Sequence, residues 1–136
     1  MAYMVRRQEV SVLCVDSSTT NLEDLRLMLE PEGFVVLSAR GGYECLSQLH
    51  RLKPAMILVE ATMPQLDGLA TCKRIRSAFK DITAPIVLIA EKTAGLTVEA
   101  VSAAGGNDLI TRPLKADKVI TVLDGWSMKV KAVAAS

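Results

Sequence analysis

The sequence has few aromatic residues, few cysteines and no excess of charge of either sign. Aromatic residues make up 4% of its 136 residues although half of the chain is hydrophobic, so the core must be aliphatic. Sixteen basic residues against fifteen acidic ones leave a formal charge of +1. This balance argues against a nucleic-acid surface or a polybasic membrane patch. We therefore expect no nucleic-acid partner and no membrane partner.

The three cysteines, Cys14, Cys45 and Cys72, form no CxxC motif and cannot all pair within one chain. That usage is typical of a reducing compartment. Each cysteine lies in an apolar stretch, where a small buried hydrophobic residue is the default role. The sequence also lacks an N-terminal apolar stretch long enough for a signal peptide, and any run that approaches a membrane span. We expect a soluble, cytoplasmic protein.

Short apolar runs alternate with segments of helical periodicity. The runs cover residues 10–15, 34–37, 55–59, 86–89 and 109–111, and the helix after the fourth run is expected at about 93–104. Five strand–helix pairs predict an α/β, doubly wound parallel sheet with helices on both faces. The length fits a single domain over residues 1–136, with a core at about 10–128 and flanking tails at 1–9 and 129–136.

In such a sheet, ligands bind beyond the carboxyl ends of the strands. The residues expected there are Asp16 and Ser17 after the first run, Glu60 after the third, Ala90 and Glu91 after the fourth, and Arg112 and Pro113 after the fifth.

Three segments resemble the receiver domains of two-component response regulators. They are VLCVD at 12–16, MPQLDG at 63–68 and Arg112 with Pro113, and the resemblance runs from about residue 10 to 128. It implies a flavodoxin-like receiver fold with strand order 2-1-3-4-5, two helices on one face and three on the other. It also implies a cis peptide bond before Pro113 and a role in two-component signalling or a phosphorelay.

In that family an acidic pair holds magnesium, an aspartate accepts the phosphoryl group, and a hydroxyl residue and a lysine complete the pocket. Here only Asp16 matches, because Ser17, Glu60, Ala90 and Arg112 stand at the other positions. Magnesium requires oxygen ligands at nearly fixed distances, and phosphoryl transfer depends on positioning and charge neutralisation. We predict a degenerate pseudo-receiver pocket with no metal, no cofactor and no enzymatic activity. Arg112 can bind a carboxylate bidentately, so we expect it to contact Glu60 or Asp16.

Three alternatives stay open. Glu60 could be a residual phosphoacceptor. The hydroxyl-rich turn at 16–21 could bind the phosphate of a flavin, although helix capping by Ser17 or Ser18 explains it more simply. A nucleotide second messenger could bind through arginines, for which Arg40, Arg74, Arg76 and Arg112 are available.

The resemblance further implies signalling through the fourth helix, the fifth strand and the fifth helix, toward a protein partner or a second copy of the chain. The helix expected at 93–104 has one charged residue, Glu99. Leu96 and Val98 would point about 200° apart on a helix, so one of them must face outward. The predicted interaction surface consists of Leu96, Val98, Val101 and Leu109.

Overall fold

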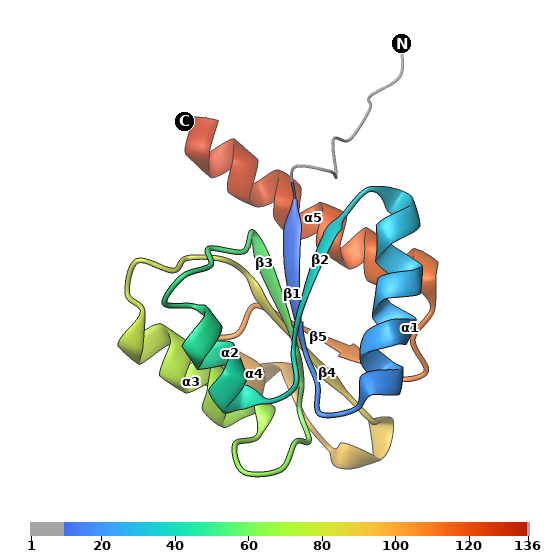
Figure 1. Cartoon of the computed structure of the whole chain (residues 1–136), viewed down its shortest axis with the longest axis vertical. Helices are drawn as coiled ribbons and strands as arrows, with labels where there is room; N and C mark the ends of the chain where they lie inside the picture. Colours follow the sequence, from blue (N-terminus) through green and yellow to red (C-terminus); the bar gives the residue numbers. More distant parts are fainter. Residues whose placement is uncertain (1–9, 136) are drawn as a thin grey trace.

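The fold is a five-stranded parallel sheet between two layers of helices (Figure 1). The computed structural model describes the backbone of residues 10–135 and the side chains of residues 10–127. The strand order β2-β1-β3-β4-β5 confirms the predicted class and order. The strands are β1 (Ser11–Val15), β2 (Val35–Ala39), β3 (Met56–Glu60), β4 (Ile86–Ala90) and β5 (Asp108–Thr111). The tail predicted at 1–9 lies outside the described residues.

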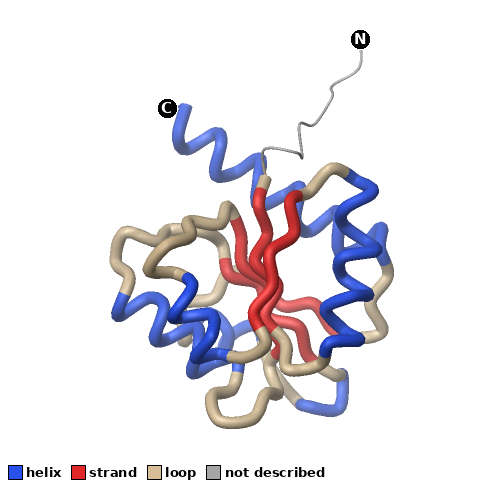
Figure 2. The backbone as a smooth tube through the Cα atoms, viewed as in Figure 1, coloured by secondary structure: helices blue, strands red, loops and turns tan. Residues whose placement is uncertain are grey.

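The helices divide between the two faces as the resemblance implied (Figure 2). One layer holds α1 (Thr19–Leu29) and α5 (Ala116–Ala135); the other holds α2 (Gly42–Gln48), α3 (Gly68–Ala78) and α4 (Val98–Ala103). Two short 3-10 turns, η2 (Glu30–Glu32) and η3 (Lys92–Ala94), follow α1 and β4. Helix α5 continues beyond residue 128, where the sequence placed the approximate end of the core. In the described part of the chain, no helix is long and apolar enough to span a bilayer.

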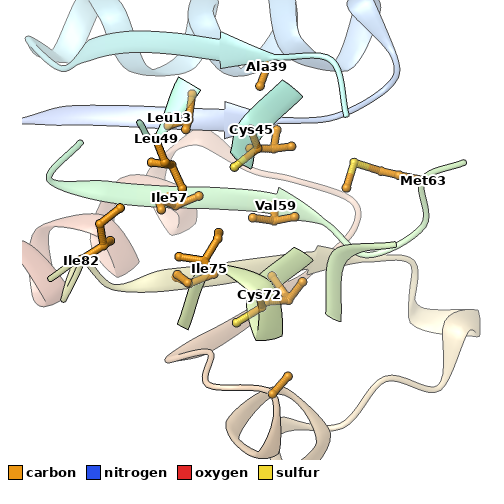
Figure 3. Close-up of a cluster of buried hydrophobic side chains, with 14 of the residues drawn as sticks. Leu13, Ala39, Cys45, Leu49, Ile57, Val59, Met63, Cys72, Ile75 and Ile82 are labelled. Carbon is orange, nitrogen blue, oxygen red and sulfur yellow. The ribbon is translucent and has the colours of Figure 1, made fainter. Parts of the chain in front are cut away.

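The core is aliphatic and lies on both faces of the sheet. Every residue of β3 and β4 is buried. Alternate residues of each strand pack against opposite helical layers. Leu13 and Ile57 pack toward α2 and α3, as Figure 3 shows, whereas Leu58 packs toward α1 and α5. Because both faces are covered, the strands appear in the sequence as unbroken apolar runs.

The fourth helix begins later than predicted. The turn η3 ends at Gly95, whose φ of 67° is left-handed and therefore suits glycine. The side chain of Thr97 then accepts a hydrogen bond from the backbone N–H of Ala100 and caps α4. Leu96 consequently lies before the helix, and the prediction that it shares a helix with Val98 was wrong.

Candidate functional site

Asp16 follows β1 directly, and the start of α1 fixes its carboxylate. The backbone N–H of Ser18 donates to Oδ1 at 2.9 Å, and Nδ2 of Asn21 donates to Oδ2 at 3.0 Å. Ser18 is the N-cap of α1, with its Oγ accepting from the backbone N–H of Asn21 at 3.1 Å. The hydroxyl-rich turn thus caps the helix and orients Asp16.

Glu60 ends β3 and is buried, with 7% of its surface exposed. Its Oε1 accepts a hydrogen bond of 2.6 Å from Nη2 of Arg112, which follows β5. The same Nη2 lies 3.6 Å from Oδ2 of Asp16, and Nε of Arg112 lies 3.4 Å from Oε1 of Glu91. One guanidinium therefore joins residues from the ends of β1, β3 and β4. This geometry confirms the predicted contact between Arg112 and the acidic residues.

The pocket residues do not fit a magnesium ion. A cation held among acidic side chains at the strand ends would face the guanidinium of Arg112, which already contacts Asp16 and Glu60. Like charges at such distances repel, and magnesium also needs several oxygen ligands in near-octahedral positions. Ser17 supplies no carboxylate. Among the described residues, no group of three or more His, Cys, Asp or Glu side chains could hold a metal ion.

Gly68 explains how the segment at 63–68 supports the pocket. A Cβ on Gly68 would lie 2.5 Å from the backbone oxygen of Glu60 and 2.8 Å from Cα of Ala61. Glycine therefore lets α3 begin against the end of β3. Asp67 caps that helix through Oδ1, which accepts from the backbone N–H of Ala70 at 2.8 Å. The segment thus holds the strand end that presents Glu60.

The fold is shared with known proteins. The chain matches the response regulator receiver domain family over residues 12–124. It belongs to that family. The receiver is 28% identical over 120 residues to an uncharacterized 14.6 kDa protein of Leptolyngbya boryana, covering 88% of this chain and 92% of that one.

Two further comparisons support the assignment. The receiver is 30% identical over 115 residues to the response regulator MprA of Mycobacterium leprae, covering 80% of this chain but only 47% of that protein. The receiver thus spans about half the length of that relative. It also resembles the solved receiver domain of a signal transduction histidine kinase from Syntrophus aciditrophicus. That match has a TM-score of 0.80 and 27% identity, and covers 90% of this chain and 92% of the other.

The remaining pocket positions of the receiver lie where the sequence placed them. Ala90 ends β4 and is buried, so its methyl group offers no hydroxyl to the pocket. The peptide bond between Arg112 and Pro113 is cis, as the resemblance implied. Sequence reasoning placed Glu91 at the strand ends without giving it a role, and it missed the contact of Asn21 with Asp16. The available signals were the position of Asn21 in the capping turn and of Glu91 directly after Ala90.

Two of the other arginines considered for nucleotide binding are engaged elsewhere. Arg76 donates to the carbonyl oxygens of Gly105, Ile82 and Ala84 and to Oδ1 of Asn107, at 2.9 to 3.1 Å. Arg74 lies over the ring of Tyr43, 5.7 Å from its centroid. Arg112, in contrast, contacts the acidic residues at the strand ends.

The predicted interaction surface is only partly exposed. Val98 is 57% exposed, whereas Leu96 and Leu109 are partly buried against the core. Val101 is 1% exposed, so its assignment to the surface was wrong. It lies on the inner side of α4, where its Cγ1 approaches Gly106 and its side chain joins the core cluster of α2 and α3.

Proposed function

We propose that this receiver domain works as a protein-interaction module whose signalling does not pass through phosphorylation. The observation that carries the proposal is the buried contact of 2.6 Å between Arg112 and Glu60. At the position where the family's phosphoacceptor stands, the carboxylate is already held by a cation of the protein itself. Charge neutralisation that the family obtains from a metal ion is here supplied by Arg112.

Two neighbouring positions support the same conclusion. Ser17 offers a neutral hydroxyl in place of a second carboxylate, and Ala90 offers no group that could move toward a phosphoryl oxygen. Glu60 also carries its reactive oxygens one methylene further from the backbone than an aspartate would. Because phosphoryl transfer depends on positioning and charge neutralisation, each of these changes works against it.

The interaction half of the proposal rests on α4. Val98 exposes 57% of its surface on a short helix, and Ala94 on the preceding turn is also exposed. Exposed apolar side chains that gather on one face are typical of an interaction site. The proposed module therefore presents α4, with Val98 at its centre, to a signalling protein in the cytoplasm.

The phosphorylation half is tested by phosphate-affinity electrophoresis after incubation with acetyl phosphate and magnesium. We expect one unshifted band for the parent chain. A shifted band that disappears in Glu60→Gln would mean that Glu60 is a phosphoacceptor, and the proposal would fail.

The interaction half is tested by capture of partners from native cell extracts. We expect Val98→Asp to lose partners that the parent chain retains, and retention to be unchanged by acetyl phosphate. Ala103→Asp is the matched control, because Ala103 is exposed on the same helix but lies about 140° around it from Val98. Equal capture by both variants would place the interface elsewhere.

A further inference from the structure

The two helical layers carry opposite charge. Helix α1 and the turn η2 form an acidic face around an exposed leucine. We define this acidic face as Glu23, Asp24, Leu27, Glu30 and Glu32. Leu27 is 65% exposed, and Glu23, Asp24 and Glu30 lie three or four positions from it along the chain. On a helix such positions are neighbours, so three carboxylates lie around the leucine. Arg26 pairs with Glu23 at 3.6 Å and with Glu30 at 3.4 Å, and the face keeps a net negative charge.

The opposite layer carries a basic face around an exposed tyrosine. We define this basic face as Arg40, Tyr43, Arg51, Lys73, Arg74 and Lys80, all exposed. Tyr43 is 50% exposed, and the guanidinium of Arg74 lies over its ring. The edge-on contact of His50 with Phe79 joins the ends of α2 and α3, so the two helices form one surface.

The acidic residues within that surface are already engaged. Glu44 accepts hydrogen bonds from the backbone N–H of Arg40 at 2.8 Å and from Nε2 of Gln48 at 3.2 Å. Asp81 pairs with Lys53 at 3.3 Å. The remaining charge of the face is positive.

Local helix stability explains only part of this distribution. Arg40 precedes the N-terminus of α2, where the helix dipole disfavours a cation. Glu30 follows the C-terminus of α1, where the dipole disfavours an anion, but its ion pair with Arg26 at 3.4 Å stabilises it there. Arg51 and Lys80 lie near helix C-termini, where the dipole favours a cation. They add charge to the face, but helix stability alone explains their positions.

We propose that the basic face binds the acidic face of a second copy of this chain. Each face has an exposed apolar or aromatic centre with charges around it, and the two sets of charges are complementary. Such complementarity determines orientation and partner choice. Aromatic and arginine side chains such as Tyr43 and Arg74 are typical of interface centres.

The geometry makes the contact head-to-tail. The acidic and basic faces lie on opposite sides of the sheet, as Figure 1 shows for α1 and for α2 with α3. One neighbour cannot engage both faces of a molecule in a closed two-fold pair. The contact is therefore heterologous and continues beyond the dimer. The proposal is independent of the phosphorylation chemistry.

Sedimentation velocity of the full chain at several salt concentrations tests the proposal. We expect weak self-association, with a dissociation constant on the order of 100 µM, at about 0.02 M ionic strength. Association should decrease at least tenfold at about 0.3 M ionic strength, because salt screens exposed charges.

Charge reversal identifies the faces. Lys73→Glu/Arg74→Glu largely cancels the positive charge of the basic face, and Glu23→Lys/Asp24→Lys cancels the negative charge of the acidic face, so each variant alone should be monomeric. An equimolar mixture of the two should associate again. Lys115→Glu/Lys118→Glu is the matched control for Lys73→Glu/Arg74→Glu, because it changes the net charge by the same amount at exposed positions outside both faces, and it should associate like the parent.

Several results would overturn the proposal. The parent chain could stay monomeric up to about 1 mM. Either charge-reversal variant could associate like the parent, or the equimolar mixture of the two variants could fail to associate. Binding of the basic face to anionic lipid vesicles or to duplex RNA, without self-association, would assign that face to another partner.

Discussion

Nη2 of Arg112 lies 2.6 Å from Oε1 of Glu60, although the two residues are 52 positions apart in the chain. The parallel sheet brings them together, because β3 and β5 end at the same edge. The guanidinium also contacts Asp16 and Glu91, so a permanent cation of the protein offsets part of the negative charge of the pocket.

Removal of Arg112 should destabilise the fold. Arg112→Ala would leave Asp16 and Glu60 buried without their cation, which costs about 3 kcal/mol in such a setting. Urea unfolding measures the change. Lys53→Ala is the control, because Lys53 and Asp81 form an exposed pair and such pairs are worth below about 1 kcal/mol. The cost of Arg112→Ala should fall in a Glu60→Gln background. An Arg112→Ala variant as stable as the parent would show that the ion pair is irrelevant.

Magnesium should not bind at millimolar concentration. The guanidinium repels a second cation and Ser17 contributes no carboxylate, so isothermal titration of the parent chain should show no binding heat. Ser17→Asp/Arg112→Ala removes the repulsion and adds a ligand, and this variant should bind magnesium in the millimolar range. Binding of equal strength by the parent and the variant would contradict the explanation.

The class of the fold was predictable from the sequence because buried parallel strands give unbroken apolar runs. The Arg112 contact was predictable because residues that follow the strands meet at one edge of the sheet. The start of α4 was not predictable, because the composition of the whole segment favours a helix. The left-handed backbone of Gly95 and the capping side chain of Thr97 determine where the helix begins. The role of Arg76 was hidden as well, because its four acceptors lie in two loops that only the fold brings together.

Arg76 should therefore behave as a structural residue. Arg76→Lys keeps the charge but cannot reach acceptors in both loops with one ammonium group. Buried carbonyls without a donor cost about 1–3 kcal/mol, and we expect a loss of stability in that range by urea unfolding. Arg74→Lys is the control, because Arg74 is exposed on the same helix. A loss no greater than that of the control would contradict this role.

The three thiols should be unreactive in the folded protein. Burial raises the pKa of Cys14 and of Cys45 to about 12, and it also raises the pKa of Cys72. Because the thiolate is the reactive form, a thiol reagent at pH 8 should modify none of them until denaturant is added. Modification of the folded chain would contradict the burial of these groups.

The same pKa shifts predict how the free energy of unfolding changes at alkaline pH. Below pH 9 the thiols are protonated in both the folded and the unfolded chain. Between pH 9 and about 12 the unfolded thiols of Cys14 and Cys45 release protons that the folded ones keep. The free energy of unfolding should therefore decrease as the pH rises through this window, as measured by urea unfolding.

The most direct measurement is intact-mass spectrometry after incubation with acetyl phosphate and magnesium. The parent chain is compared with a revertant carrying Ser17→Asp, Glu60→Asp, Ala90→Thr and Arg112→Lys, and an active receiver domain controls the reagent. We expect the parent to keep its mass, and the revertant to gain one phosphoryl group that is absent when magnesium is chelated. A phosphoryl group on the parent chain that maps to Glu60 would contradict the proposal that this receiver works without phosphorylation.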